Sequence, residues 1–353
     1  NLTGATGGST RISSATVTLS ETVTAVNDAP VLSGNGALSA VLEDVTSPSG
    51  AALSALGITA NDTADAGSIA GYAIVGNSAN AVSQGAWQYS SNSGTNSFDI
   101  GTVSDGSTAL ALASSTLVRF VPVANYNGTP TALTIRALDN SYAGTYSTTS
   151  SGESRATVNT TSTGGTTAIS SATATIGTSI TAVNDAPVAS GAATLSAVNE
   201  DTASPTGATV SSLFGGAGNF SDTKDAVTGG SSADTFVGIA VSSYTADATK
   251  GVWEYQVGGA GAWVTLGSAS TTAAITLNAA DLLRFVPTAN YNGGATSLSA
   301  NLVETGLTLT SGSSINLTGA TGGSTRISSA TVTLSETVTA VNDAPVASGA
   351  ATL

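Results

Sequence analysis

Apolar and polar residues alternate strictly along several short stretches of the chain. In the stretch SATVTLSETVTAV the Ser and Thr residues share one face, and the other face carries Ala15, Val17, Leu19, Val23 and Ala25. A period of two, rich in β-branched residues, predicts a half-buried β-strand. Residues 171–181 repeat the pattern, although Glu21, which interrupts the apolar row, is replaced there by Thr178.

Two other kinds of predicted strand also occur twice, in similar sequence. GAWQYS at residues 85–90 matches GVWEYQ at residues 251–256, and LVRFVPVANYNG at residues 117–128 matches LLRFVPTANYNG at residues 282–293. We expect their Trp residues in the core, and the Tyr of each NYNG to bond nearby backbone through its hydroxyl. No stretch shows a convincing helical period. Many short alternating strands without helices predict an all-β fold of antiparallel β-sandwiches.

The octapeptide TAVNDAPV occurs three times, and its Asn residues are Asn27, Asn184 and Asn342. The copies are 157 and 158 residues apart, and such a long fixed period indicates a structural unit repeated in tandem. Residues 1–31 are also identical to residues 316–346, and the chain contains no Met, as expected for a segment of a longer array. We therefore predict four parts arranged end to end: residues 1–25, the last strands of a preceding repeat; residues 26–182, unit one; residues 183–340, unit two; and residues 341–353, the start of another repeat.

Residues 141–167 differ from the rest of unit one because they are almost entirely polar. A Ser/Thr/Gly-rich segment of this length predicts an exposed excursion between two strands, whose removal leaves the unit folded. A second unusual stretch, GGSSADTFV at residues 229–237, nearly matches the calcium-binding nonapeptide of β-roll proteins. A β-roll needs that motif stacked several times, and here it occurs once, so we do not predict a roll.

Composition narrows the possible functions. The chain has 22 Asp and Glu residues against 8 Lys and Arg, a net charge of −14, which disfavours nucleic acid and anionic membrane surfaces as partners. It contains no Cys and no His, which excludes disulfides, thiolate chemistry and His-based catalysis. No apolar run is long enough to span a membrane. Because no acid–base pair is positioned by any readable pattern, we expect that the chain is not an enzyme.

The scarce acidic residues recur at matching positions of the two units, near strand ends and turns. Glu43-Asp44 matches Glu200-Asp201, the pair Asp62 and Asp65 matches Asp222 and Asp225, and Asp139 matches Glu304. Oxygen ligands gathered on loops are what a calcium ion requires. The competing interpretation is that each Asn-Asp pair only caps a turn before the rigid Ala-Pro.

The VNDAPV joint and the body GxWxY…LRFVPxANYNG resemble the cadherin-like and bacterial Ig-like tandem repeats of giant bacterial surface adhesins, over nearly the whole chain. This resemblance implies calcium between successive units, one ion per joint, because the acidic residue expected two places before each Asn is an Ala. The ligands it implies at the first joint are Asn27, Asp28, Asp62, Asp65 and Asp139. Those at the central joint are Glu43, Asp44, Asn184, Asp185, Asp222, Asp225 and Glu304. Those at the last joint are Glu200, Asp201, Asn342 and Asp343.

The resemblance implies a secreted, extracellular protein at a bacterial cell surface, with the chain as a calcium-stiffened stalk for adhesion or biofilm formation. Its partners would be the neighbouring repeats of the same chain. Two other functions stay open. The chain is a building block of a self-assembling filament or sheath, in which other copies are the partners, or it is a ligand-binding module that uses the polar loops. A stalk stays monomeric and elongated, whereas a filament subunit self-associates.

Overall fold

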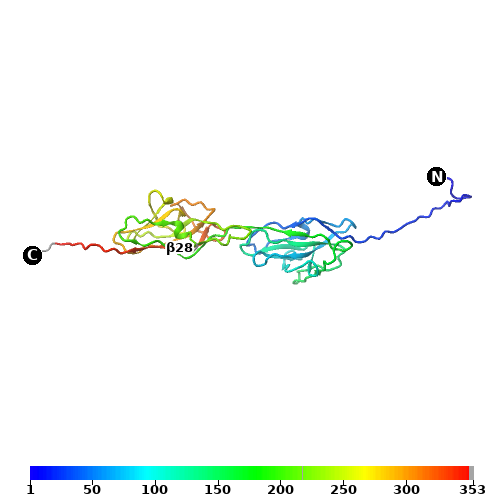
Figure 1. The fold of residues 1–353 in the computed structure, drawn as a ribbon, viewed down its shortest axis with the longest axis horizontal. Coiled ribbons are helices and arrows are strands. Elements are labelled where there is room, and N and C mark those ends of the chain that lie inside the picture. The colour runs from blue at the N-terminus through cyan, green and yellow to red at the C-terminus, as the bar shows by residue number, and fades with distance from the viewer. Residues whose placement is uncertain (217, 350–353) are drawn as a thin grey trace.

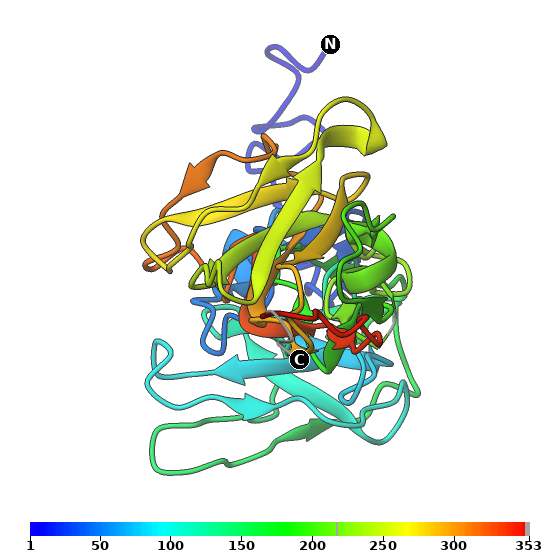
Figure 2. The same cartoon turned by 90° about the vertical axis from the view of Figure 1, so that its left-hand side faces the viewer.

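The computed structural model describes residues 1–216 and 218–349, and the fold is all-β, as predicted. Figure 1 shows two sheet-rich parts that follow one another along the long axis, with extended chain at both ends. In Figure 2 the view is from the C-terminal side, so that unit two lies in front of unit one. The two parts correspond to units one and two, and no named strand of one pairs with a strand of the other.

Unit one contains a six-stranded and a four-stranded sheet. The six-stranded sheet has the order β12 (Thr157–Val158), β9 (Ala109–Ala113), β6 (Ile69–Asn77), β11 (Leu133–Asp139), β13 (Ala174–Gly177) and β2 (Gly36–Ala37). The four-stranded sheet has the order β4 (Ala51–Ala52), β10 (Leu117–Pro122), β7 (Gly85–Ser90) and β8 (Phe98–Asp99). Two short pairs and one 3₁₀ turn complete the unit: β1 (Val31–Leu32) with β5 (Ala60–Asn61), β14 (Ile180–Thr181) with β3 (Val41–Leu42), and η1 (Leu53–Ala55).

Unit two repeats this arrangement. Its six-stranded sheet has the order β16 (Ala192–Thr194), β28 (Ile327–Ser335), β26 (Leu298–Glu304), β20 (Phe236–Ser243), β23 (Ala274–Asn278) and β27 (Ser314–Ile315). Its four-stranded sheet has the order β18 (Ala208–Thr209), β24 (Leu282–Pro287), β21 (Gly251–Gln256) and β22 (Val264–Thr265). The smaller elements are β17 (Val198–Asn199), β29 (Thr337–Thr339) and β25 (Gly293–Gly294) in one sheet, β15 (Val188–Ala189) with β19 (Phe220–Ser221), the helix α1 (Val210–Phe214) and the turn η2 (Val257–Gly259).

The core of each unit lies between its two larger sheets, and the predicted Trp residues are at its centre. Trp87 is fully buried, and its ring meets Phe120 edge-on with centroids 5.3 Å apart. Trp253 is buried in the same way against Phe285, at 5.4 Å. The Tyr291 hydroxyl donates to the Gly294 carbonyl at 2.6 Å, which confirms the bond predicted for the NYNG turn of unit two.

The predicted strand at residues 15–25 is absent from the structure. Val17 and Leu19 are each 97% exposed, whereas the identical residues Val332 and Leu334 of β28 are fully buried. The difference has a simple cause, because β28 pairs with β26 and β16, and residues 15–25 have no neighbouring strand to pair with. An alternating sequence becomes a strand only where a sheet receives it.

The polar segment at residues 141–167 lies between β11 and β13 and is mostly exposed, as predicted, but parts of it also pack against unit one. It supplies β12 to the edge of the six-stranded sheet, and Val158 packs with Ile169 in a small second core outside that sheet. Thr149 is fully buried, and its hydroxyl accepts from the Ser91 amide at 3.0 Å. Because such hydroxyls satisfy backbone groups, a Ser/Thr-rich segment can pack against a sheet.

Glu336 is the unit-two copy of Glu21, the acidic residue that interrupts the alternating pattern, and its side chain is buried. It lies between β28 and β29 and is 2% exposed, and neither carboxylate oxygen has a hydrogen-bond partner among the described residues. Burial raises the pKa of Glu336 to about 8. In unit one the same position holds Thr178, whose hydroxyl donates to the Ser39 carbonyl at 3.2 Å. Unit two therefore carries a buried carboxyl that unit one lacks.

We expect deletion of residues 143–165 to lower the unfolding temperature of unit one. The deletion removes β12 and the packing of Val158, and fully burying one Val side chain stabilises a fold by about 1.5–3 kcal/mol. Differential scanning calorimetry measures the change, with the transition of unit two as the control inside the same chain. An unchanged transition for unit one would show that the segment only covers the surface.

We expect Glu336→Thr to remove a pH-dependent loss of stability from unit two. The pKa of Glu336 in the folded state lies above its value in the unfolded chain. Below about pH 4.5 the carboxyl is protonated in both states, and unit two loses stability as the pH rises from there toward 8. The shift corresponds to a loss on the order of 5 kcal/mol. The unfolding temperature of the variant should exceed that of the wild type at pH 9 by clearly more than at pH 4.5. Equal differences at both pH values would contradict this.

Candidate metal centre

Acidic residues gather at the end of each unit where its chain enters, here called the leading end. In unit one the Asn27-Asp28 pair precedes β1, Asp62 and Asp65 follow β5, and Asp139 is the last residue of β11. Because β1 pairs with β5, the entering chain is brought to the turn that carries Asp62 and Asp65. The side chains of Asn27, Asp28, Asp62, Asp65 and Asp139 are called the unit-one cluster.

Hydrogen bonds join the members of the unit-one cluster. The Asn27 amide nitrogen Nδ2 donates to Asp139 Oδ2 at 3.2 Å, and the Asp28 backbone amide donates to Asp65 Oδ2 at 3.1 Å. Ser141 donates to Asp139 Oδ1 from its backbone amide, at 2.8 Å, and from its hydroxyl, at 2.6 Å. The linker, one turn and the end of one strand thus meet at one place.

Asp62 is a buried member of the unit-one cluster. It is 5% exposed, and among the described residues neither of its carboxylate oxygens has a hydrogen-bond donor. Burial raises its pKa, and the charges of Asp65 and Asp139 raise it further. The pKa of Asp65 is lowered instead, mainly because the Asp28 amide stabilises the charged form. A buried carboxylate without donors is costly unless a proton or a cation neutralises it.

The unit-two cluster repeats this geometry with Asn184, Asp185, Asp222, Asp225 and Glu304. Asn184 Nδ2 donates to Glu304 Oε1 at 2.8 Å, and the Asp185 amide donates to both oxygens of Asp225 at 3.2 Å. Asp185 also forms an ion pair with Lys224, at 3.3 Å between Nζ and Oδ1.

Burial again leaves carboxylate oxygens without partners in unit two. Asp222 is 5% exposed and Glu304 is fully buried, and each has one oxygen that receives no hydrogen bond from residues 1–216 and 218–349. Burial is the main cause that raises the pKa of Glu304 to about 7 and that of Asp225 to about 6. Near neutral pH, therefore, Glu304 readily takes up a proton in the absence of a cation, whereas Asp225 does so only as the pH falls toward 6.

Asp234 also belongs to the unit-two cluster, although it was not predicted from the sequence. Ligand oxygens of Asp222, Asp234 and Glu304 all lie within 4.8 Å of one another, a spacing that could hold a metal ion. Asp234 belongs to the GGSSADTFV stretch and lies in a longer loop than the matching turn of unit one, which hid the correspondence. The matching residue of unit one is Gly67, where a Cβ atom would collide with Asp62 Oδ2.

Unit two also carries a cation of its own at this place. Arg326 bonds Asp234 at 2.6 Å, and its guanidinium lies 3.9 Å from Glu304 Oε1. In unit one the matching residue is Ala168, and the residue matching Lys224 is Ala64. The unit-one cluster therefore has neither of these positive charges, and the unit-two cluster is partly neutralised by its own side chains.

The acidic pairs near the start of each unit have different contacts. Glu43 accepts from Asn127 Nδ2 at 2.9 Å and from the Val183 amide at 2.5 Å, so it ties the departing linker to the opposite end of unit one, here called the trailing end. Its charge also adds a small increase to the pKa of Asp225, which places it near the unit-two cluster. Asp44 has a positive φ and accepts from the Asn125 amide at 2.7 Å.

The trailing end of unit two is built in the same way. Glu200 accepts from Asn292 Nδ2 at 2.9 Å and from the Val341 amide at 2.6 Å, and the bond from Asn292 lowers its pKa. Asp201 accepts from the Asn290 amide at 2.9 Å. Asn342 and Asp343 are exposed, and Asn342 Nδ2 donates only to the Asp343 carbonyl, so these two are not brought into a cluster.

Both leading-end clusters offer what a calcium ion binds, since carboxylate and carbonyl oxygens are its preferred ligands. In unit one the candidate ligands are Asp28, Asp62, Asp65 and Asp139, and within the described part of the chain both oxygens of Asp62 are free to bind a cation. In unit two they are Asp185, Asp222, Asp234 and Glu304.

Comparison with known proteins gives no family for the chain. No protein-family model matches the sequence, and no curated protein matches it. Among the described residues, no helix is long and apolar enough to cross a membrane. The function must therefore be argued from the two clusters and the arrangement of the units.

We expect Asp62→Asn to abolish the stabilisation of unit one by calcium. The change removes one charge from the buried cluster, so the variant should be at least as stable as the wild type in chelator. Calcium at 100 times its dissociation constant should stabilise the wild type by about 2.7 kcal/mol and the variant by much less. Asp44→Asn is the matched control, since it removes the same charge outside the cluster. An equal calcium response of Asp62→Asn and Asp44→Asn would exclude Asp62 as a ligand.

Proposed function

We propose that the chain is a stalk segment of a very large secreted protein at a bacterial cell surface, and that calcium stiffens the joints between its units. The observation that carries the proposal is the pair of clusters at the leading ends, each with buried carboxylate oxygens that have no donor among the residues the structure describes. Each cluster includes the linker residues themselves, through Asn27-Asp28 and Asn184-Asp185. A cation bound there joins the linker to the loops of the unit that follows it.

The stalk accounts for the location of the clusters. A cation that holds Asp28 together with Asp62 and Asp139 fixes the direction in which the chain enters unit one. Without a cation, like charges that crowd one place repel by about 4 kcal/mol per pair at 4 Å and an effective dielectric constant of 20. Extracellular modules commonly bind calcium with dissociation constants of 10⁻⁴–10⁻³ M, a range suited to the surroundings of a cell.

A self-assembling filament, in which other copies of the chain are the partners, is the second candidate. The ligand-binding alternative has less support, because the polar segment that would have carried it packs against unit one.

We expect the chain to be an elongated monomer that binds calcium. Sedimentation velocity should give one species over a hundredfold range of concentration, and isothermal titration calorimetry should give saturable calcium binding that Asp62→Asn reduces. A stalk requires both results. Concentration-dependent growth would favour the filament, and an absence of binding heat together with an unchanged unfolding temperature would exclude calcium as the stiffening agent.

A further inference from the structure

The loop that leads into the six-stranded sheet is longer in unit two than in unit one. Asp65 and Gly71 are six positions apart in unit one, whereas the matching Asp225 and Gly238 are thirteen apart. The extra residues fall in the stretch 226–233, here called the docking loop, which contains most of the GGSSAD sequence.

Asn127 at the trailing end of unit one receives the docking loop. Its Oδ1 accepts from the Ser231 backbone amide at 2.6 Å, and its Nδ2 donates to the Ser231 hydroxyl oxygen at 2.8 Å. The Ser231 hydroxyl in turn donates to the Asp225 carbonyl at 2.5 Å. Asn127 Nδ2 also donates to Glu43 Oε2, so one buried amide side chain bonds both units.

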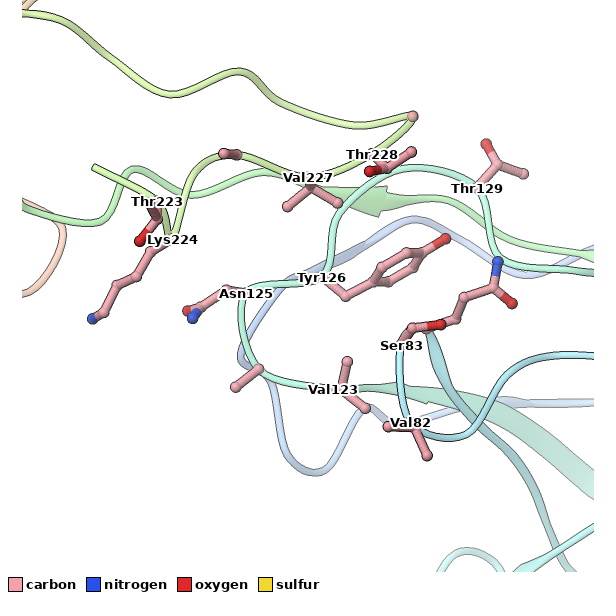
Figure 3. A pocket seen from close by; sticks show the side chains of 14 residues that line it. Val82, Ser83, Val123, Asn125, Tyr126, Thr129, Thr223, Lys224, Val227 and Thr228 are labelled. Carbon is pink, nitrogen blue, oxygen red and sulfur yellow. The ribbon is translucent and has the colours of Figure 1, made fainter. Parts of the chain in front are cut away.

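Close packing accompanies these bonds. Val227 of the docking loop packs against the hydrophobic core cluster of unit one. At Gly230 a Cβ atom would collide with Asn127 Oδ1, which explains a glycine at this position. Figure 3 shows Val227 and Thr228 beside Tyr126 of unit one. These residues line a cleft of 760 Å³ to which both units contribute.

The trailing end of unit two shows the same receiving arrangement without a loop on it. Asn292 bonds Glu200 as Asn127 bonds Glu43, but Asn292 is exposed, whereas Asn127 is only 2% exposed. Burial of the Asn side chain thus accompanies contact with the loop. The short turn of unit one has no residues that correspond to Val227 or Ser231.

We infer that the docking loop is an interaction surface that locks the central joint by direct contact between the units. A joint that leads into a unit with the long loop is held by protein contacts as well as by any cation. A joint that leads into a unit with the short turn depends on its cluster alone. The exposed Asn292 then fits the docking loop of another unit of the second kind. The inference rests on the proposed stalk only in treating the two units as consecutive links, and it needs no bound ion.

The test measures how widely the two units move relative to each other in chelator. The chain contains no Cys, so one can be introduced at exposed Thr102 of unit one and one at exposed Thr308 of unit two for spin labels. Pulsed electron–electron double resonance gives the width of the distance distribution. Three versions are compared with the labelled parent chain: Asn127→Ala, the matched control Asn292→Ala, and deletion of residues 227–233, which gives the loop the length found in unit one.

We expect a narrow distribution of the distance between the two spin labels in the parent chain and in Asn292→Ala. In Asn127→Ala and in the loop-deletion variant we expect the width of this distribution to at least double. Two results would overturn the inference: an unchanged width after deletion of the loop, or a parent that in chelator is as broad as the deletion variant. Calorimetric calcium binding at the unit-one cluster is measured on the same samples. Loss of that binding with a narrow parent would refute the calcium-bound stalk and leave the docking loop intact.

Discussion

A carboxylate that is buried without a hydrogen-bond donor or a cation costs free energy, and each unit holds such groups at its leading end. Asp62 in unit one and Glu304 in unit two are at least 95% buried, and in the part of the chain that the structure describes both oxygens of Asp62 and one oxygen of Glu304 have no hydrogen-bond donor. The fold keeps them there because β5 and the ends of β11 and β26 are fixed by their sheets. Because Asn27 and Asp28 of the linker bond Asp139 and Asp65, a cation bound at the unit-one cluster would also hold the linker.

The two units meet this constraint in different ways. Unit one leaves its cluster without any Lys or Arg, so an external cation is the natural counter-charge. Unit two adds Arg326 and Lys224, which pair with Asp234 and Asp185, and it adds a loop that contacts the preceding unit directly. An array that alternates such units would have joints of unequal dependence on calcium. Non-identical neighbours also reduce misfolding by exchange of strands between units.

Much of the fold could be predicted from the sequence, because the alternation of apolar and polar residues and the two Trp-containing motifs indicate which side chains are buried. The repeated positions matched Asp62 and Asp139 to their unit-two counterparts, but only the resemblance to cadherin-like repeats implied that these residues share a site. Asp234 could not be found in this way. The loop that precedes it is longer than the turn that precedes its counterpart Gly67, so the two positions do not align by simple counting. The packing of residues 141–167 was missed because polarity does not reveal which hydroxyls satisfy buried backbone. The exposure of Val17 shows the opposite limit, since an alternating pattern cannot show whether a partner strand is present.

Anomalous diffraction from crystals grown with a calcium-like ion such as terbium tests the central claim most directly. Our account predicts a peak within bonding distance of Asp62 and its neighbours in the unit-one cluster, and a weaker peak or none beside Arg326 in unit two. An ordered structure with no peak at the unit-one cluster, in which Asp62 instead donates a proton to Asp65, would contradict it. The buried carboxylates would then be neutralised by protons, and each Asn-Asp pair would only form a turn.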